Sequence, residues 1–303
     1  MFESQSNSKV SFFRKHRNAF DYTIFLFFPL LLYLVFFIIP NATSYVYSLF
    51  DNNGYIGTSH FTFVGLKNFV KVFQDPVFPI AFFNTVKYAV IAVISQNGLA
   101  LIFAIFLLKQ TKINNFFKTL YYLPAILSSV AIGFIWGFIL DPTIGILNVA
   151  LTKIGLGSLA QSWLGNPKIV MFTIAGIHTW QAVGGAMIIF IAGLLNIPKE
   201  LYESANIEGA NPWQVFKSIT FPLLLPVTII NIVLTTIGCF KSFDYVYIMT
   251  RGGGDKSSQV LATWLYQEGF EYMRTGIASA IAVILSVTVS ILAIIQLNLY
   301  KEK

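Results

Sequence analysis

The chain has 303 residues, of which 56% are hydrophobic and only 11% are charged, and its mean hydropathy is +0.70. An ordinary soluble domain has about 45–50% apolar and about 25% charged residues, so this composition excludes a soluble enzyme, a disulfide-rich secreted scaffold and a disordered chain. The net charge of +7 comes from cations that flank apolar runs, a pattern typical of membrane topology signals and not of nucleic-acid binding. The sequence therefore predicts an all-α integral membrane protein, with the lipid bilayer as a partner and no nucleic acid.

Six apolar stretches are long enough to cross a bilayer as helices, because a spanning helix needs roughly 20 residues. They lie at about 22–40, 86–108, 119–140, 169–195, 222–242 and 275–299. The first stretch follows a basic segment, as a signal peptide does. It is longer than the roughly 7–15 apolar residues of a signal peptide and lacks a small-x-small cleavage site, so we expect a retained helix.

The distribution of Lys and Arg predicts the orientation of these six helices. If the N-terminus is cytoplasmic, 11 of the 20 Lys and Arg residues lie in the inner segments, although the outer loops are longer in total. We therefore expect both termini in the cytoplasm and one membrane domain without repeats. Its parts are a cytoplasmic N-terminal segment 1–21, a six-helix transmembrane domain 22–299 with an external loop at about 41–85 and a cytoplasmic loop at 196–221, and a C-terminal tail 300–303.

The sequence contains no motif for catalysis or for metal binding. It has no GxxxxGK[ST], HExxH, CxxC or GxSxG pattern, and its three histidines are scattered along the chain. The single Cys239 lies in an apolar run, where a small packing residue is expected. We therefore expect no catalytic residue, no metal site and no cofactor on this chain.

The cytoplasmic loop at 196–221 has the signals of two short helices. Pro198 suits the first turn of a helix, and Gly209 suits its left-handed C-terminal cap. Asn211 can cap a second helix that opens with Pro212 and ends before Pro222. This arrangement exposes three carboxylates, those of Glu200, Glu203 and Glu208. Without further information, a solvated connector between two spans explains the segment equally well.

The same loop resembles the EAA motif of permease subunits from bacterial binding-protein-dependent ABC importers, which reads E-A-A, three residues, G, nine residues, I-x-L-P. The matching residues here are Glu203-Ser204-Ala205, then Gly209, then Ile219-x-Phe221-Pro222. Two residues depart from the family pattern, Ser204 in place of Ala and Phe221 in place of Leu. Both substitutions are mild.

Further segments resemble the carbohydrate-uptake branch of this family, of the MalF/UgpA-like type, over residues 20–299. The segment from Phe63 to Phe69 reads FVGLKNF and is similar to the external FVGLxNF/Y sequence of that branch. Trp136 with Asp141-Pro142, Gly145 and Asn148 resembles its W…DP…G…N run. Phe243-Asp244 with Thr250-x-Gly252-Gly253 resembles FD…T-x-GGP, although Gly254 replaces the proline.

The resemblance implies a MetI-like, type I ABC importer permease in the bacterial cytoplasmic membrane. This subunit would be non-catalytic and bind no cofactor, while ATP and Mg would bind to a separate ATPase. The expected partners are a second, different permease, two copies of a P-loop ATPase subunit, an extracellular solute-binding protein and a sugar substrate. In the family, the EAA helix docks into a cleft of the ATPase, and here this coupling role falls to Glu203, Ser204, Ala205 and Gly209.

The resemblance also points to residues of a substrate path. Gln181 lies three residues from His178 on the same helix face, and His178 and Lys241 stand where maltose-type permeases have Asn, so a different sugar is expected. Hydrogen bonding between helices is the alternative role for such polar groups, and Lys241 can instead snorkel to the membrane interface. The residues that match sugar-contacting positions are Ser128, Ser129, His178, Lys241 and Ser242.

Three alternatives remain open at the sequence level. A permease of the same family that imports glycerol-3-phosphate or a related polar solute would use Lys241 as a counter-charge. A secondary transporter would need carboxylates within its spans, where Asp and Glu are almost absent. A scaffold without transport activity would leave the EAA pattern without a role.

Overall fold

A computed structural model describes residues 25–51 and 61–301 of the chain. Three predicted parts of the chain lie outside the described residues: the N-terminal segment 1–21, the first residues of the first span and the end of the C-terminal tail. The basic side chains of the N-terminal topology signal lie outside the described residues as well. Five described helices are long and apolar enough to cross a membrane. They are Phe25–Tyr47, Val77–Phe106, Val170–Leu195, Pro212–Phe240 and Thr275–Asn298.

The remaining predicted span, at 119–140, is a pair of helices and not one helix. Helix α5 (Lys112–Ile126) and helix α6 (Ser129–Ile139) meet at a bend of 97°. Leu127 and Ser128 between them have extended backbone conformations. Pro124 lies inside the last turn of α5 and has no N–H for the helical ladder, so the helix is weakest just before the break. The sequence therefore has six apolar segments of sufficient length, but one of them is broken.

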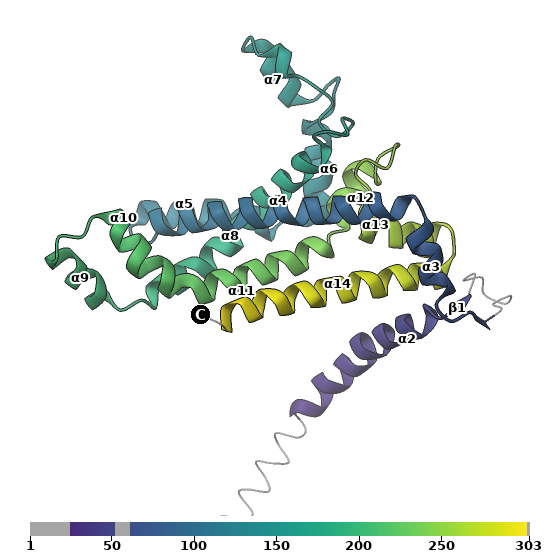
Figure 1. Cartoon of the computed structure of the whole chain (residues 1–303). Helices are drawn as coiled ribbons and strands as arrows, with labels where there is room; N and C mark the ends of the chain where they lie inside the picture. The colour runs from purple at the N-terminus through teal and green to yellow at the C-terminus, as the bar shows by residue number, and fades with distance from the viewer. Residues whose placement is uncertain (1–24, 52–60, 302–303) are drawn as a thin grey trace, which may run out of the picture.

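Four long helices form the centre of the molecule. Helices α4 (Val77–Phe106), α8 (Val170–Leu195), α11 (Phe221–Phe240) and α14 (Thr275–Lys301) lie side by side (Figure 1). Two core clusters follow their length, one around Tyr88, Met171 and Val246 and the other around Phe190 and Leu224. Helices are packed this way in bilayers because small residues and shape, not the hydrophobic effect, hold them together.

Two parts of the chain leave this bundle on opposite sides. The first helix contains a π-helical segment η1 (Leu34–Ile38) followed by α2 (Ile39–Tyr47), and its side chains are almost all exposed. On the other side, α6 leads to α7 (Ile146–Lys153) and to the short η2 (Gly157–Leu159) (Figure 1). Such extended apolar parts need lipid or another subunit as their surroundings.

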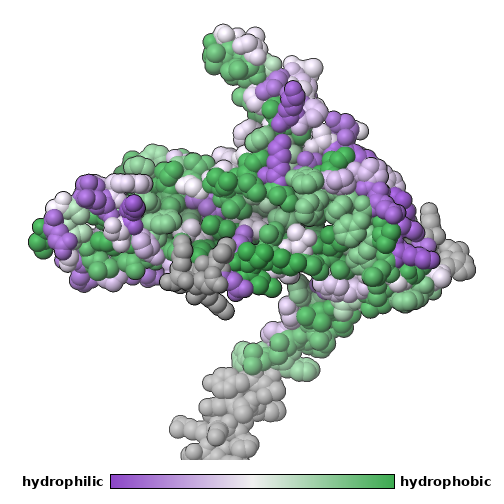
Figure 2. All heavy atoms as spheres, in the orientation of Figure 1, coloured by the Kyte–Doolittle hydropathy of each residue, from purple (hydrophilic) through white to green (hydrophobic). Residues whose placement is uncertain are grey.

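Hydropathy is distributed over the surface as a membrane protein requires. In Figure 2, hydrophilic residues gather over the α9 end of the bundle and over the α3 side at the opposite end, while hydrophobic residues cover most of the face between them. A folded soluble protein does not expose a continuous apolar band of this kind. The bundle axis therefore runs between two polar ends, as expected for helices that cross a bilayer.

The predicted external loop at 41–85 contains more regular structure than expected. Strands β1 (Phe50–Asp51) and β2 (Thr62–Phe63) pair antiparallel with Phe50 opposite Phe63, and helix α3 (Lys67–Gln74) precedes α4. The Asn68 amide donates to the carbonyls of Ser48 and Phe50, both at 2.9 Å. Helices α2 and α4 extend into the loop from both sides, and residues 52–60, including Asn52-Asn53-Gly54, lie outside the described residues.

The second cytoplasmic-loop helix does not end before Pro222, so that prediction is wrong. Helix α10 (Pro212–Val215) continues through the π-helical η3 (Phe216–Thr220) directly into α11, and the whole helix spans Pro212–Phe240. A proline ring inside a helix clashes with the carbonyl four residues earlier. The wider π turn lies immediately before Pro222 and changes the hydrogen-bond register there, so the helix continues past the proline.

Three short helices lie between α11 and α14. They are α12 (Asp244–Thr250), α13 (Leu261–Tyr266) and the π-helical η4 (Gln267–Glu271). On η4, the buried carboxylate of Glu268 forms an ion pair with Arg274, with 2.7 Å between Arg274 Nε and Glu268 Oε2. The indole N–H of Trp264 also donates to this carboxylate.

This ion pair predicts a pH-dependent stability. Burial raises the pKa of Glu268 above its ordinary value, while the charge of Arg274 and the Trp264 N–H act in the opposite direction. The folded state therefore binds more protons than the unfolded state between the two pKa values, and the free energy of unfolding falls as the pH rises through this window. Arg274→Gln removes the compensating cation, so the pKa of Glu268 rises further.

We expect Arg274→Gln to lower the free energy of unfolding by about 2 kcal/mol at pH 8, less than the roughly 3–5 kcal/mol of a fully buried pair because Arg274 is half-exposed. At pH 5 the loss should be smaller, since Glu268 then takes up a proton. Thermal unfolding in detergent at both pH values measures the difference, with Glu271→Gln on the exposed side of η4 as the control. Equal losses at pH 5 and pH 8 would contradict the assignment.

Candidate functional site

The first candidate site is the loop between α8 and the long helix that begins at Pro212. Helix α9 (Lys199–Ile207) follows Pro198 and ends in two hydrogen bonds, from Gly209 N to Asn206 O at 3.1 Å and from Ala210 N to Ala205 O at 3.0 Å. This pair of bonds is a Schellman cap. Gly209 has φ +75°, which confirms its predicted left-handed conformation.

The start of the next helix is equally well defined. The Asn211 side chain accepts from Gln214 N at 2.9 Å, and the Gln214 side chain accepts from Asn211 N at 2.8 Å. This reciprocal capping box satisfies two backbone N–H groups that the helix itself leaves unpaired. The predicted cap at Asn211 and the helix start at Pro212 are confirmed. The turn between α9 and α10 therefore has one defined geometry.

The exposed face of this loop combines carboxylates with apolar side chains. Glu203 and Ile207 lie four residues apart and share one face of α9, while Ala205 on another face is buried. Ile207 is 87% exposed and Trp213 is 68% exposed. Large apolar side chains on a protruding helix mark protein interaction sites. We call the residues Glu200, Glu203, Ser204, Ile207 and Trp213 the loop surface, and all five are exposed.

Sequence reasoning missed Ile207 and Trp213, although both are large apolar residues in a short, polar stretch. The predicted exposure of Glu200, Glu203 and Glu208 is confirmed, and Ser204 is exposed as well. Of the other two residues expected to couple to the ATPase, Ala205 is buried and Gly209 forms the predicted left-handed cap. Ala205 packs inward, and Gly209 is exposed with open space beside it. The glycine is therefore required by its positive φ and not by a close neighbour.

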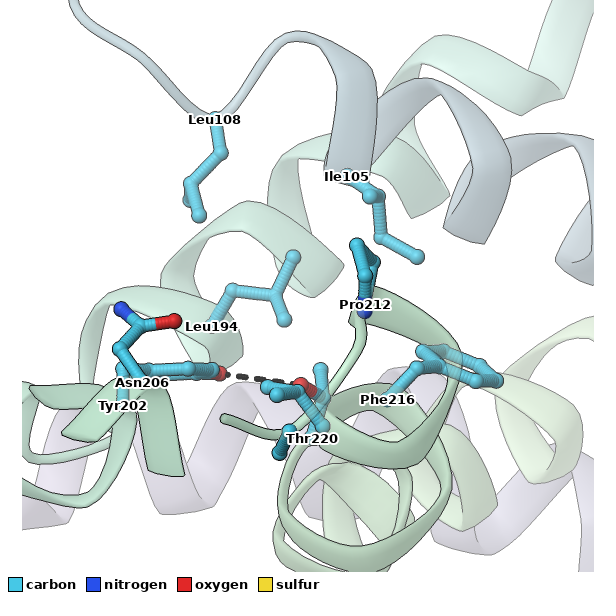
Figure 3. A pocket seen from close by; sticks show the side chains of 10 residues that line it. Ile105, Leu108, Leu194, Tyr202, Asn206, Pro212, Phe216 and Thr220 are labelled. Carbon is cyan, nitrogen blue, oxygen red and sulfur yellow. Dashed lines mark hydrogen bonds between the residues drawn. The ribbon is translucent and has the colours of Figure 1, made fainter. Parts of the chain in front are cut away.

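A hollow of about 370 Å³ separates α9 from the start of the long helix. In Figure 3, Tyr202 and Asn206 from α9 lie on one side of this hollow, Phe216 lies on the other, and Tyr202 points toward Thr220. The Tyr202 and Thr220 hydroxyls form a hydrogen bond of 3.2 Å, which joins α9 to η3.

The second candidate site is a set of polar side chains between the helices, far from the loop. Tyr88 on α4 and Ser242 after α11 form a hydroxyl–hydroxyl hydrogen bond of 3.1 Å. The His178 ring stacks on Tyr88, with 5.6 Å between ring centroids, and lies 5.1 Å from the Tyr245 ring. Gln181 Nε2 donates to the Leu127 carbonyl at 2.7 Å, and Gln181 Oε1 accepts from the Tyr245 hydroxyl. We call this set the polar seam, and its members are Tyr88, His178, Gln181, Ser242 and Tyr245.

The structure brings most of the predicted path residues into or beside this seam. His178, Gln181 and Ser242 belong to it, and Ser129 lies beside it through a hydrogen bond to Asp244. Ser128 and Lys241 are exposed and lie outside it. For Lys241, this exposure at the end of α11 agrees with the snorkelling alternative.

The tyrosines of the seam were missed from the sequence. Tyr88 is 1% exposed and Tyr245 is 9% exposed. Both lie in apolar segments, where an aromatic residue is expected to be an ordinary packing residue of the core. Their hydroxyls are the available signal, because a buried hydroxyl needs a partner. Among the residues that the structure describes, no three His, Cys, Asp or Glu side chains come together as a metal site would require.

Comparison with known proteins identifies the family. Residues 96–302 match the family described as "Binding-protein-dependent transport system inner membrane component". The chain belongs to this family. Its members are ABC transporter permeases, so the predicted permease family and the predicted multi-pass membrane location are both confirmed.

Several permeases of this family are similar to the chain over most of its length. The probable ABC transporter permease protein YurN of Bacillus subtilis (strain 168) is 37% identical, covering 90% of this chain and 94% of YurN. The arabinooligosaccharides transport system permease protein AraP of the same organism is 33% identical (88% and 84% coverage). AmyD of Thermoanaerobacterium thermosulfurigenes, a probable starch degradation products transport system permease protein, is 30% identical (97% and 98% coverage).

The permease fold is also seen in a solved structure. A chain of a bacterial alginate ABC transporter, in complex with an alginate pentasaccharide-bound periplasmic protein, matches with a TM-score of 0.80 and 22% identity over 93% of this chain and 94% of that chain. This likeness shows the fold. The predicted MetI-like permease fold is therefore confirmed, whereas the break within the predicted third span was not expected from the sequence.

Proposed function

We propose that this permease is one of two different membrane subunits of an ATP-driven importer of oligosaccharides. The observation that carries the proposal is the similarity, over at least 88% of this chain, to permeases named for arabinooligosaccharides and for starch degradation products. The multiple sugar-binding transport system permease protein MsmF of Streptococcus mutans, 30% identical over 95% of the chain, adds a third sugar system.

The polar seam supports a sugar as the cargo. A neutral, polyhydroxylated ligand is recognised by hydrogen-bonding side chains together with aromatic faces. The seam supplies hydroxyls from Tyr88, Ser242 and Tyr245, the amide of Gln181 and the ring of His178. These groups are buried or half-buried between helices of this subunit in the present structure, so in this proposal the seam opens toward the second permease when substrate passes.

The loop surface supports coupling to an ATPase. In this proposal, Glu203 and Ile207 of α9 contact a cleft on one of two P-loop ATPase subunits, which bind ATP and Mg and perform the hydrolysis. The end of α14 lies at the same end of the bundle as α9 and α10 (Figure 1), as expected if this end and the C-terminus are cytoplasmic. An extracellular solute-binding protein would deliver substrate at the opposite end.

Uptake measurements in a strain that lacks this permease test the proposal. Complementation with the wild-type chain should restore ATP-dependent uptake of labelled arabino- or malto-oligosaccharides, and inactivation of the partner ATPase should abolish it. Restored uptake of glycerol-3-phosphate but of no sugar would favour the alternative cargo. Uptake that persists without the ATPase and follows an ion gradient would overturn the assignment as an ABC importer.

A further inference from the structure

Hydrogen bonds link two consecutive residues at the start of α12 to the two sides of the break between α5 and α6, one directly and one through a residue of α8. Asp244 accepts a hydrogen bond from the hydroxyl of Ser129, the first residue of α6. Tyr245 donates to Gln181 Oε1, and Gln181 Nε2 donates to the carbonyl of Leu127, the residue that follows α5. The two ends of the break are thus both tied to α12, one directly and one through Gln181 of α8.

The packing between α6 and α12 is close and makes them one unit. A Cβ atom on Gly133 of α6 would lie 2.9 Å from Ile248 Cγ2 of α12, so a larger residue at this position would force Ile248 to shift. Ile132 and Val246 beside this contact are 1% and 0% exposed. An interface without free space has discrete arrangements and does not deform continuously. The break and α12 should therefore change position together.

In this structure the polar groups of the path are already paired with one another. The Ser129 hydroxyl is bound to Asp244, both ends of the Gln181 amide are bound, and the Ser242 hydroxyl is bound to Tyr88. These groups are the ones that a sugar would contact. A sugar hydroxyl must therefore replace an internal partner, because a polar group left unpaired away from water is costly.

We propose that Asp244 and Tyr245 form a latch that closes the substrate path. In the closed state they occupy, through hydrogen bonds, the groups of α6 and α8 that sugar hydroxyls occupy when the path is open. The two residues are positioning residues, since they act on the path through Ser129 and Gln181. This inference rests on the proposed function for the identity of the cargo, but the pairing of α12 with the break does not depend on it.

Removing single hydroxyl groups tests the latch in the complete transporter. Tyr245→Phe and Ser129→Ala each delete one latch hydrogen bond with little change of shape. In the reconstituted complex without binding protein and without sugar, we expect each to raise ATP hydrolysis about fivefold, the population shift that the loss of one net hydrogen bond produces. Ser129→Thr, which keeps a hydroxyl, should return hydrolysis toward the wild-type rate.

Tyr247→Phe is the matched control for Tyr245→Phe. Tyr247 lies two residues further along α12 and donates to Glu271, outside the latch. Its substitution should leave ATP hydrolysis in the absence of sugar unchanged. A purely structural role for Tyr245 would lower hydrolysis and uptake together and would not raise hydrolysis without substrate.

Amide hydrogen exchange gives a readout that does not depend on the cargo. Tyr245→Phe and Ser129→Ala should speed exchange in residues 126–132 around the break, and Tyr247→Phe should not. Wild-type rates of both exchange and hydrolysis in the two latch variants would overturn the latch. If the wild-type complex imports no oligosaccharide, the proposed cargo fails, while faster exchange in these variants would still support the latch.

Discussion

Gly184→Ala is expected to destabilise the permease by about 3 kcal/mol, the upper end of the usual cost of overpacking. A Cβ atom at this position would lie 2.2 Å from the backbone oxygen of Tyr121 and 2.7 Å from the Cα atom of Tyr122. Both obstacles belong to the backbone of α5, so no side-chain rotation relieves the clash. Helix α5 would have to move away from α8, and thermal unfolding of the purified protein in detergent measures the loss.

The neighbouring Gly185 is a matched control for this prediction. A Cβ atom on Gly185 would have no neighbour within 4 Å. Gly185→Ala should therefore leave stability unchanged or raise it by up to about 1 kcal/mol, the difference in helix propensity between Gly and Ala. If the two variants unfold at the same temperature, α5 does not pack against α8 as closely as the structure describes. Displacement of α5 would also disturb the break at Leu127, so uptake should fall with Gly184→Ala alone.

The spanning segments were predictable because the bilayer imposes a simple rule on the sequence. A run of roughly 20 apolar residues is visible without knowledge of the fold. The break between α5 and α6 was not visible, because residues 127–129 interrupt the apolar run only with two serines. Pro124 was the available signal for the end of α5, but prolines are tolerated inside membrane helices. Pro222 shows the opposite case, since a stop signal there was followed by a continuous helix.

The ends of the two loop helices, α9 and α10, were predictable from individual capping residues. Pro198, Gly209 and Asn211 act on backbone groups within a few residues of themselves, so local sequence determines their effect. The polar seam was only partly predictable, because its contacts join distant parts of the chain. Tyr88 and Ser242 are 154 residues apart, and Gln181 and Leu127 are 54 residues apart. Which polar groups pair across such separations is decided by helix packing and not by local sequence.

The two candidate sites are connected by one helix. The hydrogen bond between Tyr202 and Thr220 joins α9 to η3, and η3 continues into α11, which ends just before Ser242 of the polar seam. π-helical turns often lie at positions where a helix changes shape in function. Motion of α9 therefore has a continuous physical route to the path, through a helix that is irregular at its base and regular beyond it.

The turn at Gly209 lies at the first step of this route. Gly209→Val is expected to lower uptake at least about 10-fold, which corresponds to about 1.4 kcal/mol. A β-branched residue with φ near the observed +75° costs about 1–3 kcal/mol. The turn would relax to a negative φ, both Schellman hydrogen bonds would be lost, and Glu203 and Ile207 would no longer face the ATPase subunit proposed to bind here. Membrane insertion should be normal, because the spans are not altered.

Gly209→Asn separates the effect of backbone conformation from that of side-chain size. Asparagine tolerates the left-handed conformation better than valine, and a side chain at this position has open space beside it. Asn at this position should retain most of the uptake. The measurement is uptake per molecule of permease in the membrane, together with recovery of the ATPase in a gentle-detergent purification of the permease. If Val and Asn variants transport equally well, the conformation of the α9–α10 turn is not what couples this permease to ATP hydrolysis. If only the Val variant loses both the ATPase and uptake, the capped geometry of α9 is the part of the loop on which coupling depends.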